Sequence, residues 1–159
     1  MQAQSEVSYG AIEPRARVLI VDDEPQVLLA MQDMLGEEFE TLTAANGQCA
    51  LQLARSESDL AVIISDQRMP SMTGDQVLEE AGRCCSAIRI LFTGYADLAA
   101  VVRAVNHGRI FAYVTKPWNA EHLRMTIRQA VEQYSLTREL AKERQLLGDL
   151  LNSAPDAIY

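Results

Sequence analysis

The stretch VLIVDDEP, residues 18–25, contains the change of pattern from which the fold can be inferred. Its first four residues are apolar and mostly β-branched, which is typical of a strand buried on both faces. The apolar run ends at Asp22-Asp23-Glu24, and Pro25 suits the first turn of a helix. Apolar residues then recur at helical spacing as far as Gly36, which can end the helix. The stretch therefore predicts a strand, an acidic turn and a helix.

The same alternation repeats along the rest of the chain. Further apolar runs, typical of strands, cover residues 41–44, 60–65, 88–92 and 110–114. Helical spacing separates them, and a last helix begins near Asn119. This order predicts an α/β fold: a doubly wound, five-stranded parallel sheet with helices on both faces. Ligands of such sheets bind beyond the carboxyl ends of the strands.

Composition limits the possible functions. A chain of 159 residues, 48% hydrophobic and 23% charged, fits one folded domain with an extension. A net charge of −8 without a Lys/Arg cluster repels polyanions, so no nucleic acid is expected as a partner. No run approaches the ~18 apolar residues of a membrane span, and the amino-terminal residues lack the pattern of a signal peptide. With three cysteines and no CxxC pair, we expect a cytoplasmic protein that does not contact membranes.

The last helix carries two apolar stripes in different phases. The first ends at Tyr134 and is expected to pack on the sheet. The second follows the 4-3-4-3 spacing of a coiled coil through Leu136, Leu140, Glu143, Leu147 and Leu150. We therefore expect a protruding, self-associating linker over residues 135–152. The alternative is one amphipathic helix that folds back on the domain.

Polar residues at the predicted strand ends point to chemistry. Asp22 and Asp23 follow the first strand and Asp66 ends the third, so a parallel sheet would gather three carboxylates at one edge. Clustered carboxylate oxygens suit Mg²⁺, which commonly bridges carboxylate to phosphate. Lys116 after the fifth strand adds a positive charge, and Thr93 after the fourth adds a hydroxyl donor. Taken alone, the first acidic pair could merely cap a helix; together these residues predict a phosphoryl pocket with an aspartate nucleophile.

Together with a tyrosine in the fifth strand and a proline after the lysine, these residues resemble the receiver domain of two-component response regulators. The shared residues are Asp22-Asp23, Asp66, Thr93, Tyr113 and Lys116-Pro117. The resemblance covers about residues 17–134 and implies the flavodoxin-like form of the doubly wound sheet. It also implies a signalling protein rather than an enzyme, limited to its own phosphotransfer and dephosphorylation.

The resemblance implies a role for each residue of the acidic edge. Asp66 would accept a phosphoryl group from a phosphohistidine on a sensor histidine kinase or a phosphotransfer protein. Asp23 and Asp66 would bind Mg²⁺ directly, and Asp22 would bind it through water. The backbone carbonyl of Arg68 would be the remaining protein ligand.

It further implies a switch. Lys116 would contact the acyl phosphate, Thr93 would move toward it, and Tyr113 would turn inward. These movements would change the face formed by the fourth helix, fifth strand and fifth helix, through which, with the carboxyl-terminal helix, a homodimer is expected. In this family the Lys116–Pro117 peptide is usually cis, which the sequence alone does not reveal.

Some positions depart from the family pattern or extend beyond it. Thr73 occupies a position where many receivers carry aspartate, and Arg68 and Tyr95 occupy positions that influence the lifetime of the phosphoryl group. The last ten residues resemble the opening of a PAS sensory domain, so residues 153–159 are interpreted as its start and residues 1–16 as a flexible leader. The output domain would then lie outside this chain.

Two alternative functions remain. A Mg²⁺-dependent phosphatase with an aspartyl-phosphate intermediate requires an acid two residues after its nucleophile, commonly as DxD, whereas this chain has Asp22-Asp23-Glu24. A phosphorylation-independent dimerisation scaffold would tolerate loss of Asp66, Thr93 or Lys116, yet all three are present.

Overall fold

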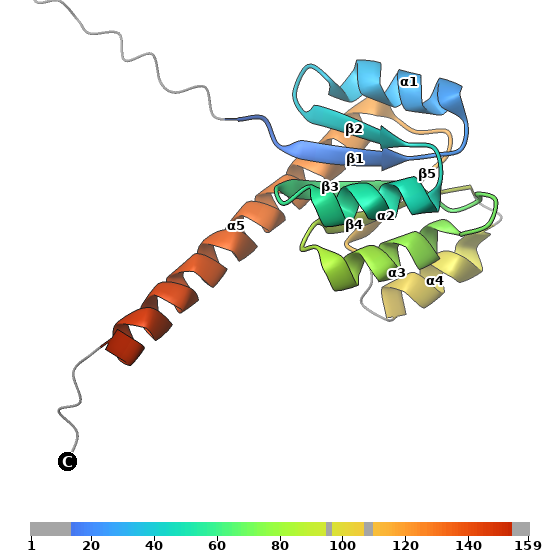
Figure 1. Ribbon diagram of the computed structural model, residues 1–159. Helices are drawn as coiled ribbons and strands as arrows, with labels where there is room; N and C mark the ends of the chain where they lie inside the picture. The colour runs from blue at the N-terminus through green and yellow to red at the C-terminus, as the bar shows by residue number, and fades with distance from the viewer. Residues whose placement is uncertain (1–13, 95–96, 107–109, 154–159) are drawn as a thin grey trace, which may run out of the picture.

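The computed structural model describes residues 14–94, 97–106 and 110–153 (Figure 1). Within these ranges, five strands alternate with five helices. The strands are β1 (Arg17–Val21), β2 (Glu40–Ala44), β3 (Leu60–Asp66), β4 (Ile88–Thr93) and β5 (Ala112–Thr115). The helices are α1 (Pro25–Leu35), α2 (Gly47–Ser56), α3 (Gly74–Cys84), α4 (Leu98–Asn106) and α5 (Ala120–Ser153).

The strands form one parallel sheet in the order β2-β1-β3-β4-β5. Strand β1 lies inside the sheet, with β2 on one side of it. After β2 the chain crosses to the other side of β1, where β3, β4 and β5 follow in order. With right-handed crossovers, this reversal places helices on both faces. The predicted doubly wound, five-stranded fold is confirmed.

Each face of the sheet has its own apolar core because successive side chains of a strand point to opposite faces. Val18 and Ile20 of β1 pack into the core beneath α1 and α5. Leu19 and Val21 pack into the core beneath α2 and α3. All seven residues of β3 are buried, so Asp66 ends the most enclosed segment of the sheet.

The fifth strand begins later than the sequence pattern predicts. We expected it over residues 110–114, but pairing with β4 starts where Ala112 meets Ile90. Ile110 packs against the core without joining the strand. Phe111 makes one backbone hydrogen bond to Arg89 and is 44% exposed. The apolar run thus includes one packing residue and one surface residue that precede the strand.

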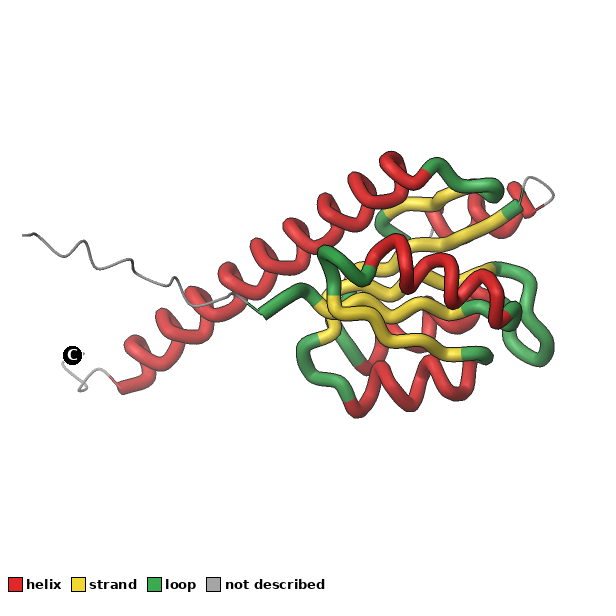
Figure 2. Tube along the Cα trace, turned by 90° about the horizontal axis from the view of Figure 1, so that it is seen from above, coloured by secondary structure: helices red, strands yellow, loops and turns green. Residues whose placement is uncertain are grey.

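Helix α5 continues far beyond the sheet. The side chain of Asn119 caps its start by accepting a hydrogen bond from the backbone of His122 at 3.1 Å. The helix then runs for 34 residues, through Gly148, a length of about 50 Å. Figures 1 and 2 show its second half extending away from the domain.

The expected extended carboxyl-terminal helix is confirmed, and it does not fold back. Its first stripe, which includes Leu123, Ile127 and Ala130, is buried in the core. The leucines of its second stripe are exposed; Leu136 is 56% exposed and Leu147 is 60% exposed.

Several expectations concern residues that the structure leaves undescribed. Nearly all of the leader and of the PAS-like segment falls in residues 1–13 and 154–159, and Tyr95 also lies outside the described ranges. Among the described helices, none combines the length and apolar character needed to cross a bilayer.

Candidate functional site

The strand register assembles the site at the carboxyl edge of the sheet. Val21 pairs with Ser65, so Asp22 and Asp66 leave neighbouring strands at the same level. On the other side of β3, Thr93 pairs with Thr115, and Lys116 follows immediately. Residues far apart in sequence therefore converge, as the alternating pattern predicts.

Three carboxylates gather at this edge. One oxygen from each of Asp22, Asp23 and Asp66 lies within 4.8 Å of the others. Asp22 is 1% exposed and Asp66 is 7% exposed, whereas Asp23 is open to solvent. Two enclosed carboxylates and an accessible one fit a hard cation such as Mg²⁺, which takes oxygen ligands and keeps several waters.

Lys116 supplies the counter-charge. Its Nζ lies 3.1 Å from Asp66 Oδ1 and 3.3 Å from Asp22 Oδ2. It also lies 5.1 Å from the centre of the Phe92 ring, which in turn packs against Trp118. The lysine backbone donates to Thr93, and the Lys116–Pro117 peptide is cis. The ammonium group thus lies between two carboxylates and over the Phe92 ring.

Burial and charge pairing shift the pKa values of both Asp66 and Lys116. Burial raises the pKa of the Asp66 carboxyl; the hydrogen bond from Lys116 opposes this rise, and the Asp22 carboxylate adds to it. Burial lowers the pKa of the Lys116 ammonium, but its hydrogen bond and attraction to Asp66 outweigh this effect and leave that pKa above its ordinary value. The lysine therefore keeps its charge beside the aspartate.

The two expected switch residues lie in different environments. Thr93 is 2% exposed, and its hydroxyl donates to the carbonyl of Gly94 at 3.1 Å. Tyr113 on the neighbouring strand is 46% exposed. The threonine thus has a local backbone partner, while the tyrosine ring contributes to the outer surface.

The loop after Asp66 is braced by residues to which the sequence pattern assigns no role. The backbone of Gln67 donates to Phe92 and accepts from Gly74, each at 3.0 Å. Its side chain donates to Asp75 at 2.8 Å and accepts from the Asp75 backbone at 2.9 Å. Three of these bonds fix the end of β3 to the start of α3, and the fourth joins it to β4. In the sequence, Pro70 and Gly74 signal a turn here but not these contacts.

Two positions that depart from the family pattern have clear local partners. The Thr73 hydroxyl donates to Asp75 at 2.5 Å, so it helps to organise the start of α3. The Arg68 guanidinium donates to both oxygens of Asp97, at 2.9 and 3.1 Å, although 70% of its side chain is exposed. This ion pair connects the loop after Asp66 with the segment that leads into α4.

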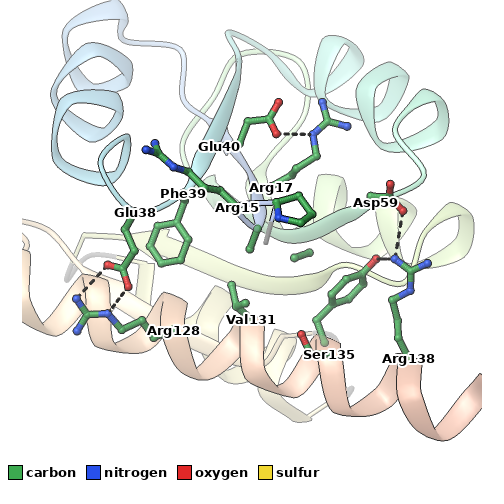
Figure 3. A pocket seen from close by; sticks show the side chains of 14 residues that line it. Arg15, Arg17, Glu38, Phe39, Glu40, Asp59, Arg128, Val131, Ser135 and Arg138 are labelled. Atoms are coloured by element: carbon green, nitrogen blue, oxygen red, sulfur yellow. Dashed lines mark hydrogen bonds and ion pairs between the residues drawn. The ribbon is translucent and has the colours of Figure 1, made fainter. Parts of the chain in front are cut away.

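A cavity of about 650 Å³ lies at the opposite end of the sheet (Figure 3). Its lining includes Arg17 and Asp59, near the starts of β1 and β3, and Arg128 and Arg138 of α5. A second hollow, of about 440 Å³, is lined by residues that include Asp23. The larger cavity is therefore separate from the carboxylate cluster, and only the smaller one borders it.

Comparison with known proteins agrees with this geometry. Residues 18–128 match the family described as the response regulator receiver domain. The hydrogenase transcriptional regulatory protein HoxA of Cupriavidus necator is 38% identical over 129 residues, covering 80% of this chain and 27% of that protein. The regulatory protein AtoC of Escherichia coli is 33% identical over 147 residues, covering 87% of this chain and 32% of that protein. This chain thus spans about a third or less of either relative.

Solved structures are similar over nearly their whole length. The signal receiver domain of an HD domain-containing protein from Pseudomonas fluorescens Pf-5 has a TM-score of 0.75 and 31% identity, covering 84% of this chain and 98% of that one. A response regulator receiver domain protein from Clostridium thermocellum has a TM-score of 0.73 and 29% identity, covering 77% of this chain and 98% of that one.

The family match favours a signalling role over both a phosphatase and a phosphorylation-independent scaffold. Members of this family interact with histidine kinases or phosphotransfer proteins. The chain belongs to the response regulator receiver domain family of two-component systems.

Proposed function

We propose that Asp66 is the phosphoacceptor of this receiver. Its carboxylate would attack the phosphorus of a phosphohistidine on a sensor kinase or phosphotransfer protein. The new oxygen–phosphorus bond would form as the nitrogen–phosphorus bond breaks, and the imidazole would leave with the bonding electron pair. The observation that carries this proposal is the convergence of three carboxylates on one ammonium group, with Lys116 Nζ 3.1 Å from Asp66 Oδ1.

The same cluster would hold Mg²⁺. We assign Asp23, Asp66 and the backbone carbonyl of Arg68 as direct ligands and Asp22 as a ligand through water. The mutual spacing of the carboxylate oxygens supports this assignment, and the exposure of Asp23 leaves a path for entry. When bound, the ion would offset negative charge on the phosphoryl oxygens.

Lys116 would stabilise the phosphorylated form of Asp66. Before transfer, its ammonium balances the charge of Asp66; after transfer, it would donate to an oxygen of the attached phosphoryl group. Its raised pKa supports a permanently charged donor at this position. This role requires little movement, because the ammonium already lies within hydrogen-bond distance of the acceptor.

Thr93 and Tyr113 would convert the modification into a change of surface. A phosphoryl group brings up to about two negative charges and strong acceptor oxygens. The Thr93 hydroxyl would exchange the Gly94 carbonyl for one of these oxygens, and Tyr113 would turn into the space that the threonine leaves. The present bond from Thr93 to Gly94 and the exposure of Tyr113 support an unmodified state as the starting point.

The surface affected would be a dimer interface. Apolar side chains are exposed along α4, just before β5 and on β5: Leu98, Val102, Val105, Phe111 and Tyr113. We propose that two copies meet through this α4–β5–α5 face and through the protruding part of α5. Residues 17–134 would form the receiver and residues 135–152 a linker to an output module of a longer protein, whose PAS-like start would be residues 153–159. We place its action in the cytoplasm, where the three free cysteines would remain reduced.

Intact-mass spectrometry after treatment with acetyl phosphate and Mg²⁺ tests the central assignment. The parent chain should gain the mass of one phosphoryl group, and the gain should require Mg²⁺. Asp66→Ala should abolish it, whereas Asp33→Ala, an aspartate in α1, should not. An unmodified parent chain, or an adduct that persists in Asp66→Ala, would overturn the assignment.

A further inference from the structure

The protruding half of α5 presents an ordered apolar stripe to solvent. Its positions at 4-3-4-3 spacing are Leu136, Leu140, Glu143, Leu147 and Leu150, here called the seam. The seam leucines are 49–60% exposed. This spacing corresponds to alternating d and a positions of a coiled-coil heptad, in which the seam faces a partner helix.

Residues beside the seam favour a second copy of this chain as that partner. With Leu140 at position a, Glu139 occupies position g and Arg144 occupies position e of the next heptad. In a parallel, in-register pair, position g of one helix faces the following e of the other. Glu139 of each copy would therefore face Arg144 of the second copy, giving two attractive contacts. An antiparallel pair would instead bring g toward g and e toward e.

The receiver is attached to the face of α5 opposite the seam. Arg138 donates to Asp59 at 3.2 Å and to the Tyr134 hydroxyl at 3.0 Å (Figure 3). Arg138 and Tyr134 occupy positions f and b, which point away from positions a and d. Two seams can consequently meet while each receiver keeps its own contacts with the helix.

One seam position opposes pairing. Glu143 at position d would bring two carboxylates together inside the interface, where water no longer screens them. The seam spans only about two heptads, and short isolated helices are marginal in water. Pairing would thus need receivers already held close, which raises the effective concentration of the linkers.

We propose that residues 136–151 of two copies form a parallel, in-register coiled coil, specified by Glu139 and Arg144, and that Glu143 keeps it from forming without receiver dimerisation. This inference rests on the proposed phosphorylation switch. Because of Glu143, the linker helices would pair only when the receivers dimerise.

Sedimentation velocity on the full chain, with Mg²⁺ and with or without beryllofluoride, tests the role of Glu143. Glu143→Leu should tighten dimerisation without beryllofluoride by at least tenfold, equivalent to about 1.4 kcal/mol. Asp149→Leu, which changes the same charge at the outer position c, should have no such effect. A Glu143→Leu chain that dimerises no better than the parent overturns the proposal.

Charge exchange and crosslinking test the geometry. Glu139→Arg should weaken the beryllofluoride-dependent dimer, and Glu139→Arg with Arg144→Glu should restore it. Under mild oxidation, Leu140→Cys should give 140–140 disulfides, mapped by peptide mass against the parent with its native cysteines. In a mixture of Leu140→Cys and Leu147→Cys chains, preferential 140–147 links would overturn the parallel register.

Calorimetric titration of the same samples with beryllofluoride separates two kinds of failure. A parent chain that does not bind the analogue refutes the phosphorylation switch. Normal binding, combined with linker variants that leave dimerisation unchanged, refutes the coiled coil alone.

Discussion

Replacing Gly74 with alanine should disturb the loop after Asp66 through a direct backbone conflict. Gly74 begins α3, and a Cβ atom there would lie 2.1 Å from the Asp66 carbonyl oxygen and 2.8 Å from its carbonyl carbon. It would also lie 3.0 Å from Cα of Gln67. All three are main-chain atoms, so rotation of a side chain cannot relieve the overlap. The end of β3 or the start of α3 must move instead.

The cost can be estimated from this overlap. Forcing an extra carbon into a packed site with a backbone shift typically costs about 1–3 kcal/mol, and three main-chain contacts favour the upper end. A domain stable by about 5–15 kcal/mol stays folded after such a loss. Displacing Asp66 relative to Lys116 should also weaken binding of beryllofluoride, because both groups would contact the analogue.

Urea unfolding and calorimetric titration with beryllofluoride and Mg²⁺ measure the two effects. Gly148→Ala is the matched control, because a Cβ at Gly148 meets nothing within 4 Å. In a helix interior, that change should be neutral or stabilising by up to about 1 kcal/mol. If Gly74→Ala remains within about 0.5 kcal/mol of the parent and binds the analogue normally, the close contact between α3 and Asp66 is refuted.

Three further changes probe other parts of the molecule. Lys116→Ala removes the charge 3.1 Å from Asp66 and should weaken beryllofluoride binding at least about tenfold, while circular dichroism stays native; an unfolded variant would instead make the lysine structural. Mg²⁺ should raise the melting temperature of the parent chain more than that of Asp23→Asn, because binding to the folded state stabilises it; equal shifts would exclude Asp23 as a ligand. The hydrogen bond from Arg128 lowers the pKa of Glu38, so its stabilisation should be present above the unfolded value of about 4.3 and disappear as pH falls through the folded pKa. The urea midpoints of the parent and Glu38→Gln should therefore differ at pH 7 and converge as pH falls through the folded pKa of Glu38; a difference independent of pH would contradict this.

Sequence patterns predict the convergence of the charged residues because it depends on topology. Once alternating strands and helices indicate a parallel sheet, residues at strand ends must share one edge. Asp22, Asp66 and Lys116 each follow or end a recognisable apolar run, and the structure brings all three together. Their placement needs no knowledge of loop geometry.

Contacts formed by loops were not predictable in this way. The bonds between Gln67 and Asp75 depend on how one turn folds back on the start of α3. The pairing of Arg68 with Asp97 depends on two loops that follow different strands. Polar residues in turns have many partners within reach, and no periodicity selects among them. The late start of β5 has a similar origin, because apolar Ile110 and Phe111 satisfy the strand pattern before regular pairing with β4 begins at Ala112.

The change of stripe along α5 shows how one helix serves two surfaces. Up to Tyr134, its apolar residues follow the phase that faces the sheet, and from Leu136 they follow a phase that faces solvent. No break in the helix accompanies this change, since α5 is continuous from Ala120 to Ser153. A continuous helix transmits a rotation or shift of its base along its length, whereas a hinge would absorb it. Any movement of α5 against the sheet would therefore reorient the exposed leucines, so the proposed switch would reach the linker only if it moves the base of α5.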